Sequence, residues 1–270
     1  MKTIDLNNRR SEPSQGHTSK GNQPKWQIEG TWYKADHMGY EALTEVLVSR
    51  LLEQSTICDF VKYEPAQIIY DGKTVNGCAS RNFRAKDEML IPFERLHRAY
   101  HGQGLAKAIA GMESSLDRIQ YTVDFVEAAT GLENVGAYLT ALVEIDSFFL
   151  NEDRHTNNLA VIRNESNGLF RLCPVFDNGL SLLSDLNDYP LDSEVRSCIS
   201  RVKAKPFDRD FDEQVSAAEQ LYGTQVRFRF TRDHVAREIN AFRGIYSDAI
   251  LSRVERVLLE QMRKYPVYFV

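Results

Sequence analysis

The chain has 270 residues, of which 43% are hydrophobic and 26% are charged, enough for one sizeable two-lobed domain or two small ones. Lys and Arg number 33 against 38 Asp and Glu, and the net charge of -5 provides no general attraction for nucleic acid or an anionic membrane. Four scattered cysteines without a Cys-x-x-Cys pair indicate neither a zinc knuckle nor a disulfide framework. We therefore expect a protein of a reducing cytoplasm that does not bind nucleic acid directly.

Residues 1–25 are rich in Ser, Asn, Gln, Gly and Pro, a composition that buries little surface and predicts a flexible arm. Within this arm, residues 16–23 could turn over a phosphate with their backbone amides. They lack the Gly-Lys-Ser/Thr ending of a P-loop and follow no predicted strand, so a disordered tail is the alternative. The arm has no apolar core, and no uncharged apolar run of about 18 residues occurs elsewhere, so we expect neither a secretory signal nor a membrane span.

A hairpin is predicted over residues 26–34, where two short β-like runs flank a Glu-Gly turn and Lys34 lies on the second run. Residues 40–54 follow as an amphipathic helix, with Glu41 and Glu45 one turn apart. A strand lysine held by a glutamate of the next helix is the arrangement that kinases use to bind nucleotide phosphates. For a single lysine taken alone, exposure to solvent is the commoner explanation.

Further strands are predicted over residues 60–63 and 67–70, the second of them closed by an Asp-Gly turn. Together with the hairpin they complete a small sheet. Helix-forming stretches dominate after about residue 80, and we place the boundary between two lobes there. Residues 89–93 and 94–100 are interpreted as a loop and a helix.

Residues 138–150 form a nearly uninterrupted apolar helix, which predicts that the helix is buried. It leads into Asn-Glu-Asp-Arg-His-Thr-Asn-Asn at residues 151–158, whose Asn and Asp residues favour turns and caps over helix interiors. Two strands at 159–162 and 169–172 then form a hairpin. Antiparallel strands of similar length are expected to bring Asn158 near Asp177.

Two other groups of residues have competing explanations. His97 and His101 are four residues apart, as metal ligands on a helix would be, but no third ligand is evident and a structural pair is favoured. The C-terminal part is predicted to be helical, with helices at 211–222, 231–242 and 245–264. Before these helices lies a basic stretch, which could receive an acidic substrate but is more simply solvated surface. It contains Arg196, Arg201, Lys203, Lys205 and Arg209.

The chemistry of residues 151–179 indicates phosphoryl transfer. Asp153 can orient an acceptor hydroxyl and take its proton. Carboxylate and amide oxygens, here those of Asp177 and Asn158, are ligands that Mg²⁺ accepts while keeping water and phosphate ligands. Arg154 or His155 could stabilise charge beside Asp153, although a neighbouring Arg is also expected simply to pair with an exposed Asp.

These motifs carry a family resemblance. Asp-Arg-His-x-x-Asn at 153–158, followed by Phe-Asp-Asn-Gly at 176–179, resembles the catalytic and metal-binding motifs of HipA-like kinases. More broadly it resembles those of phosphatidylinositol-type kinases. The shorter, CtkA-like bacterial Ser/Thr protein kinases are the most similar members. The likeness also takes in Trp-Tyr-Lys at 32–34, the helix at 40–54, Arg-Asn-Phe at 81–83 and Lys-Pro-Phe at 205–207.

The resemblance implies an α+β, two-lobed protein-kinase-like fold, with a small β-rich N-lobe at residues 1–80 and a mostly helical C-lobe at 81–270. It implies a catalytic role for Asp153 and its neighbour His155. Asn158 and Asp177 would bind Mg²⁺ and, with it, the nucleotide. Lys34 would bind the phosphates of ATP.

The resemblance has further implications. Glu45, ahead of Glu41, would be the partner of Lys34. Cys78 and Ser80 would line the adenine pocket, by position only. Residues 14–22, including Ser19 and Gly21, would form the phosphate-covering loop, with autophosphorylation at Ser14, Thr18 or Ser19.

The implied function is that of an ATP- and Mg-dependent protein Ser/Thr kinase, in a toxin or effector role, acting on a protein substrate. The alternatives are a phosphatidylinositol-type lipid kinase and a catalytically silent kinase-fold binding module. The joint presence of Lys34, Asp153, Asn158 and Asp177 argues against the silent module. The chain before Lys34 is too short for the extra N-terminal subdomain of full-length HipA, so an antitoxin or repressor partner would be a separate protein. We expect a location in the bacterial cytoplasm, and secretion as an effector without a signal peptide remains open.

Overall fold

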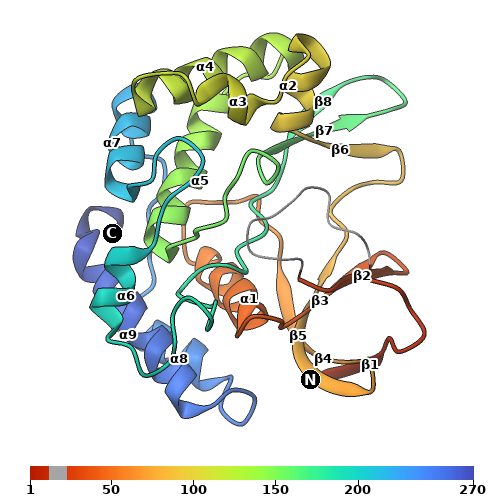
Figure 1. Cartoon of the computed structure of the whole chain (residues 1–270), viewed down its shortest axis with the longest axis vertical. Coiled ribbons are helices and arrows are strands. Elements are labelled where there is room, and N and C mark those ends of the chain that lie inside the picture. Colours follow the sequence, from red (N-terminus) through yellow and green to blue (C-terminus); the bar gives the residue numbers. More distant parts are fainter. Residues whose placement is uncertain (12–22) are drawn as a thin grey trace.

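The computed structural model describes residues 1–11 and 23–270, and Figure 1 shows a curled sheet beside a larger, mostly helical part. The sheet has five strands in the order β1-β4-β5-β3-β2. All neighbouring strands are antiparallel except the parallel pair of β1 and β4. The strand bounds are β1 Lys2–Asp5, β2 Lys25–Ile28, β3 Thr31–Ala35, β4 Tyr63–Tyr70 and β5 Lys73–Arg81.

Both predicted turns of this sheet are confirmed. The turn between β2 and β3 consists of Glu29 and Gly30, with φ values of 48° and 77°. The turn between β4 and β5 consists of Asp71 and Gly72, with φ values of 48° and 70°. Positive φ at both central positions matches the right-handed twist of the flanking strands, which is why Gly and Asp favour such hairpins.

Three predictions for the strands need correction. Residues 2–5 were expected in a flexible arm but form β1, which pairs with β4. Residues 60–63 do not form a strand of their own, because Phe60 makes only an isolated bridge to Val175 and Tyr63 is already the first residue of β4. Residues 88–92, expected mainly as a loop, form strand β6. Each of these outcomes depends on a partner that is distant in the sequence, which a local pattern does not reveal.

Helix α1, Glu41–Leu52, lies between the sheet and the helical part (Figure 1). Its position along the chain was predicted, but its amphipathic character was not confirmed. Eleven of its 12 residues are buried, and the exception, Arg50, exposes 27% of its side chain. Both glutamates of the helix are therefore enclosed. A helix without a solvated face is positioned by its packing on every side, so α1 sits firmly between the two parts.

The helical part is built around α5, Val135–Phe149, which is buried as predicted. The helical part also contains a second sheet, in the order β6-β7-β8, which includes the predicted hairpin. Its strands are β6 Glu88–Pro92, β7 Ala160–Asn164 and β8 Phe170–Leu172. The other helices are α2 Phe93–His101, α3 Leu105–Ile109, α4 Ser115–Thr130, α6 Val195–Arg201, α7 Phe211–Tyr222, α8 Arg232–Asn240 and α9 Asp248–Lys264, with a 3-10 turn at Pro266–Tyr268.

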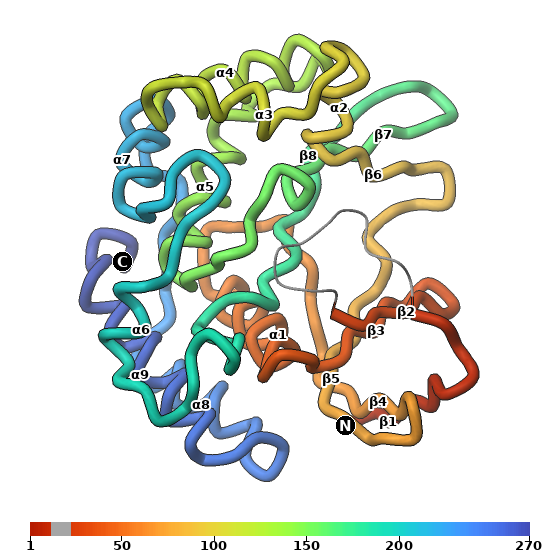
Figure 2. Tube along the Cα trace, in the orientation of Figure 1, coloured from red at the N-terminus to blue at the C-terminus, as the bar shows by residue number. Residues whose placement is uncertain are grey.

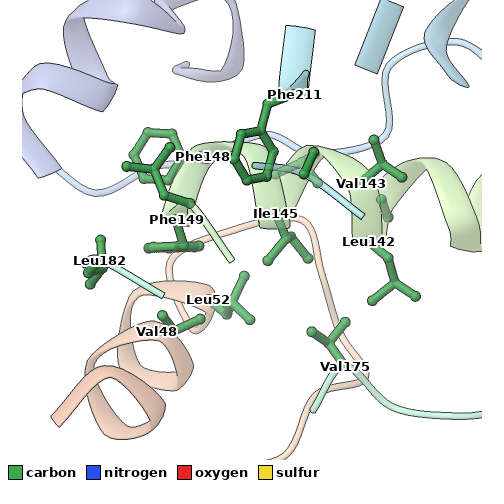
Figure 3. Close-up of a cluster of buried hydrophobic side chains, with 14 of the residues drawn as sticks. Val48, Leu52, Leu142, Val143, Ile145, Phe148, Phe149, Val175, Leu182 and Phe211 are labelled. Carbon is green, nitrogen blue, oxygen red and sulfur yellow. The ribbon is translucent and has the colours of Figure 1, made fainter. Parts of the chain in front are cut away.

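One hydrophobic core joins α1 to the helical part. Figure 3 shows side chains of α1 and α5 meeting residues from the segment after β8 and from α7. These buried residues include Val48, Leu52, Leu142, Val143, Ile145, Phe148, Phe149, Val175, Leu182 and Phe211. The five-stranded sheet has a smaller core of its own, formed by Leu6, Trp26, Tyr33, Ala35 and Ile68. Because α1 belongs to the larger core, its orientation follows the helical part.

The three predicted C-terminal helices are confirmed as α7, α8 and α9. Asp210, Thr231 and Ser247 cap their N-termini by accepting hydrogen bonds from backbone N–H groups of the first turn. Within residues 1–11 and 23–270, no helix has the length and apolar character needed to cross a bilayer.

Candidate active site

The segment that follows α5 begins with a backbone change at Leu150, whose φ of 58° ends the helix. The amide of Asn151 donates to Asp146 Oδ1 at 2.9 Å and to the carbonyl of Asp177 at 3.3 Å. Its side-chain Oδ1 accepts from the N–H of Asp153 at 3.1 Å. Asn151 therefore joins the end of α5, the predicted catalytic loop and the second motif. Figure 2 shows the traces of these segments running together beside α1.

Arg154 has a structural role that the sequence did not indicate. Its guanidinium forms two hydrogen bonds with Asp146, at 2.8 and 2.9 Å, and each of the two side chains is 1% exposed. It also donates to the carbonyl of Phe176 at 2.7 Å and to Asn178 Oδ1 at 3.0 Å. The expectation that Arg154 pairs with an exposed Asp or stabilises developing charge is thus replaced. The residue holds residues 153–158 against residues 176–178.

Asp153 is held firmly by its backbone, because its carbonyl accepts from the Asn158 amide at 3.0 Å and its N–H donates to Asn151. Its carboxylate is 12% exposed, with Lys205 Nζ 3.3 Å from Oδ1 and His155 Nε2 3.8 Å from Oδ2. Burial raises the pKa of Asp153, and the nearby His155 and Lys205 oppose that rise. Asp153 thus combines an anchored backbone with a carboxylate that faces a lysine and a histidine.

His155 is placed beside Asp153, as the motif suggested. Both of its ring nitrogens are buried and make no hydrogen bond within the described part of the chain. A buried polar atom without a partner is costly, so such a site commonly serves a ligand or an ordered water.

Asn158 and Asp177 retain oxygens that suit a divalent cation. The Asn158 amide nitrogen is used by the carbonyl of Asp153, and its Oδ1 accepts no hydrogen bond from the described residues. Asp177 Oδ1 contacts Lys34 Nζ at 2.7 Å, while Oδ2 accepts no hydrogen bond from those same residues. No cluster of three His, Cys, Asp or Glu side chains occurs in the described ranges, but Mg²⁺ bound with a nucleotide needs only one or two protein ligands. The two side chains fit such an ion.

Asp177 also has unusual backbone and electrostatic properties. Its φ of 63° is rare for a residue other than glycine, and such conformations cluster at functional sites. Burial by itself would raise the pKa of Asp177, but the charges of Lys34 and Lys25, together with the hydrogen bond from Lys34, outweigh that effect and hold the pKa well below its ordinary value. Asp177 is therefore an anion at neutral pH.

Lys34 of β3 and Glu45 of α1 form the predicted pair, with Lys34 Nζ bonded to Glu45 Oε1. The other oxygen, Oε2, accepts from the N–H of Asn178 at 2.9 Å. The Glu45 side chain has no exposed surface, and burial raises its pKa although Lys34 opposes the rise. Burial would lower the pKa of Lys34, but Asp177 and Glu45 together raise it well above its ordinary value. One ammonium thus joins the sheet, α1 and the segment after β8.

Glu41 has a different role, which explains why it is not the partner of the lysine. Its carboxylate accepts hydrogen bonds from the backbone N–H groups of residues 37–39, at distances from 2.7 to 3.3 Å. It therefore organises the loop that enters α1. One turn later, Thr44 donates to the carbonyl of Gly179 at 2.6 Å and adds a second link between α1 and the segment after β8.

The predicted adenine-pocket residues differ in exposure from what was expected. Cys78 has no exposed surface and belongs to the main hydrophobic core, where it pairs in register with Lys34. It underlies the lysine and presents no surface to a nucleotide in this conformation. Ser80 is 7% exposed and pairs in register with Trp32. The proposed phosphate-loop residues Ser14, Thr18, Ser19 and Gly21 lie outside the described residues.

Neither the histidine pair nor the basic stretch forms a separate site. Both ring nitrogens of His97 are bonded, to the carbonyl of Gln103 at 2.7 Å and to the Tyr121 hydroxyl at 2.8 Å, which confirms the structural explanation. In the basic stretch, Arg196 pairs with Glu260 at 3.0 Å while Lys205 contacts Asp153. Arg196 and Lys205 thus make separate local contacts.

The sequence reasoning missed Asn151, Asp146 and Lys205 as parts of this site. The Asn at the helix end was interpreted only as a residue that favours turns and caps, and Asp146 was not singled out within the apolar helix. Its position there was a usable signal, because a carboxylate inside a buried helix needs a partner. Lys205 was noted as part of the Lys-Pro-Phe likeness and the basic stretch, and neither observation indicated Asp153.

Comparison with known proteins extends these observations. No family model matches the chain, and no curated protein matches it in sequence. Among solved structures it is similar to the Helicobacter pylori proinflammatory kinase CtkA, with a TM-score of 0.63 and 15% identity over 97% of this chain and 94% of that one. At this identity the likeness establishes the fold. The chain has the two-lobed, kinase-like α+β fold that its motifs predicted.

Proposed function

We propose that the protein is an ATP- and Mg²⁺-dependent protein Ser/Thr kinase. The observation that carries this proposal is the joint contact of Lys34 with Glu45 and Asp177. A strand lysine, a helix glutamate and a second-motif aspartate meet in one network, as phosphoryl transfer requires. The loop of Asp153 and Asn158 is tied to that network through the contacts of Asn151 and Arg154.

Each side chain then has a defined task. Lys34 binds phosphate oxygens, which compete with Asp177 Oδ1 for the same ammonium while the enclosed Glu45 keeps its hold on the lysine. The Asp153 carboxylate accepts the proton of the acceptor hydroxyl as the new O–P bond forms at the γ-phosphorus and the bond to the β-phosphate oxygen breaks, releasing ADP. Asn158 Oδ1 and the Asp177 carboxylate would hold Mg²⁺, which when bound neutralises charge on the phosphates.

His155 supports the same proposal. Its ring nitrogens make no hydrogen bond with the described residues, and Nε2 lies 3.8 Å from the Asp153 carboxylate, where the acceptor and the transferred group would meet. We assign to His155 a contact with the phosphoryl group or with the acceptor hydroxyl.

The test is phosphate transfer from γ-labelled ATP with Mg²⁺, comparing the wild type with Asp153→Asn and Asp177→Ala. We expect Asp153→Asn to lose about 10²- to 10⁴-fold in rate, as removal of a general base does. Asp192→Asn is the matched control, since Asp192 is exposed and remote in sequence from both motifs. Equal rates in the wild type and both site variants would refute the proposal and favour the silent binding module.

The acceptor is resolved by parallel reactions with dephosphorylated casein and with phosphatidylinositol vesicles. Label transferred to casein alone supports a protein kinase, and label transferred to lipid alone supports the phosphatidylinositol-type alternative. Autophosphorylation is tested on the same samples by mass spectrometry of the peptide that contains Ser14, Thr18 and Ser19. An unmodified peptide in an otherwise active enzyme would remove the autophosphorylation part of the proposal.

A further inference from the structure

Lys205 comes from a segment that is fixed to the helical part at several points. The N–H of Ala204 donates to the carbonyl of Arg209 at 3.0 Å, which closes the segment on itself. Phe207 is fully buried, its N–H donates to Gln214 Oε1 at 2.9 Å, and its carbonyl accepts from Arg118 at 2.7 Å. The backbone near Lys205 is therefore held by α4 and α7 rather than left as a free loop.

This anchored segment brings Lys205 to Asp153, 52 residues earlier in the chain, with 3.3 Å between Nζ and Oδ1. The lysine side chain is 34% exposed and the aspartate side chain 12% exposed, so the contact lies at the edge of solvent. The distance is slightly longer than an ideal charge-assisted hydrogen bond. Contacts of this kind in free enzymes often tighten only when the substrate is bound.

The backbone contacts of Asp153 do not orient its carboxylate. Its N–H and carbonyl are bonded to Asn151 and Asn158, whereas its two carboxylate oxygens face Lys205 and His155. Within residues 1–11 and 23–270, Lys205 is the only lysine or arginine in ion-pair range of that carboxylate.

The other cations of the site have separate tasks. Lys34 contacts Glu45 and Asp177, and Arg154 is fully engaged with Asp146 and the backbone and side chain of residues 176–178. Neither is placed to orient the Asp153 carboxylate. Lys205, which comes from the segment before α7, is the cation that contacts this carboxylate.

We propose that Lys205 is a positioning residue for the kinase reaction: it binds Asp153 Oδ1 and so fixes the carboxylate in the orientation that receives the proton of the acceptor hydroxyl. This inference rests on the proposed function and adds a residue outside both motifs. It follows that the active site is complete only when the segment before α7 is docked against the helical part.

A double-mutant cycle tests the proposal. We expect Lys205→Met to lower kcat by about 10- to 100-fold, since small misplacements of a reacting group have effects of this size, with little change in KM for ATP. In an Asp153→Asn background, Lys205→Met should change the residual rate by less than about 2-fold, because a residue that acts through Asp153 has nothing left to position. Lys205→Arg should restore much of the lost kcat.

The controls separate this role from a structural one. Lys203→Met, two residues earlier and exposed, should keep wild-type kinetics. Lys205→Met should retain the wild-type melting temperature. Additive losses in the cycle, or an unchanged kcat in Lys205→Met, would overturn the positioning role while leaving the kinase proposal intact. Absence of transfer by the wild type would instead refute the kinase proposal itself.

Discussion

Replacing Lys34 by methionine perturbs stability as well as catalysis, because this ammonium separates two carboxylates. Glu45 has no exposed side-chain surface, while Asp177 is 34% exposed and Lys34 12% exposed. Methionine preserves much of the side-chain length but leaves two neighbouring carboxylates without their shared cation. The structure therefore predicts a loss of folding free energy in addition to the loss of phosphate binding.

The size of that loss follows from the burial of the partners. Removing one member of a buried ion pair costs about 3–5 kcal/mol, since the remaining charge is left unpaired. Water reaches Asp177 and offsets part of the penalty, so we expect about 3 kcal/mol, equivalent to a decrease of roughly 6–12 °C in Tm. Because burial already raises the pKa of Glu45, that residue is the one expected to take up a proton in the variant.

A second substitution tests the explanation. Lys34→Met/Glu45→Gln removes one of the two charges while keeping an acceptor for the N–H of Asn178, so it should recover all but about 1 kcal/mol of the stability and none of the activity. Urea denaturation followed by tryptophan fluorescence is a suitable assay, because both tryptophans, Trp26 and Trp32, lie in the hairpin that carries Lys34. A double variant no more stable than Lys34→Met would refute this reasoning, as would a single variant within about 0.5 kcal/mol of the wild type.

Three further predictions concern Asp146, Asp36 and Asn158. Asp146→Asn leaves the buried Arg154 without its counter-charge and should lower the free energy of unfolding by about 3–5 kcal/mol in urea denaturation, and an unchanged midpoint would contradict the assigned role. Burial raises the pKa of Asp36 from 3.8 to about 8, with the N–H of Ala42 opposing that rise, so its contribution to stability is complete below pH 4 and disappears as the pH rises through 8. The Asp36→Asn variant should accordingly show a smaller decline of stability between pH 5 and pH 8, and above pH 8 its free energy of unfolding should be larger than that of the wild type. Urea denaturation at each pH measures this, and an unchanged pH profile would argue against the role of Asp36. Asn158→Ala should raise the Mg²⁺ concentration required for half-maximal transfer by about 10-fold or more, while loss of its hydrogen bond to the Asp153 carbonyl should lower the free energy of unfolding by only about 1 kcal/mol. An unaltered Mg²⁺ titration would remove Asn158 from the metal site.

Local patterns in the sequence determined most of the elements and the chemistry of the two motifs. The two-residue turns, the buried helix α5 and the C-terminal helices follow from residue preferences and periodicity over short stretches. The choice of Glu45 over Glu41 as the partner of Lys34 came from the family resemblance, and the structure explains it, since Glu41 is occupied by the backbone of residues 37–39.

Tertiary structure alone decided how those parts are connected. Strand β1 and the burial of α1 on all sides depend on partners far along the chain, and Cys78 is a core residue because its strand, β5, packs against α1. The contact between Lys205 and Asp153 joins segments 52 residues apart. Spacing along a sequence records which side chains share a helix face or a strand face, but it does not record which loops meet in space. For that reason the motif predicted the chemistry of Asp153, and only the fold disclosed the lysine beside it.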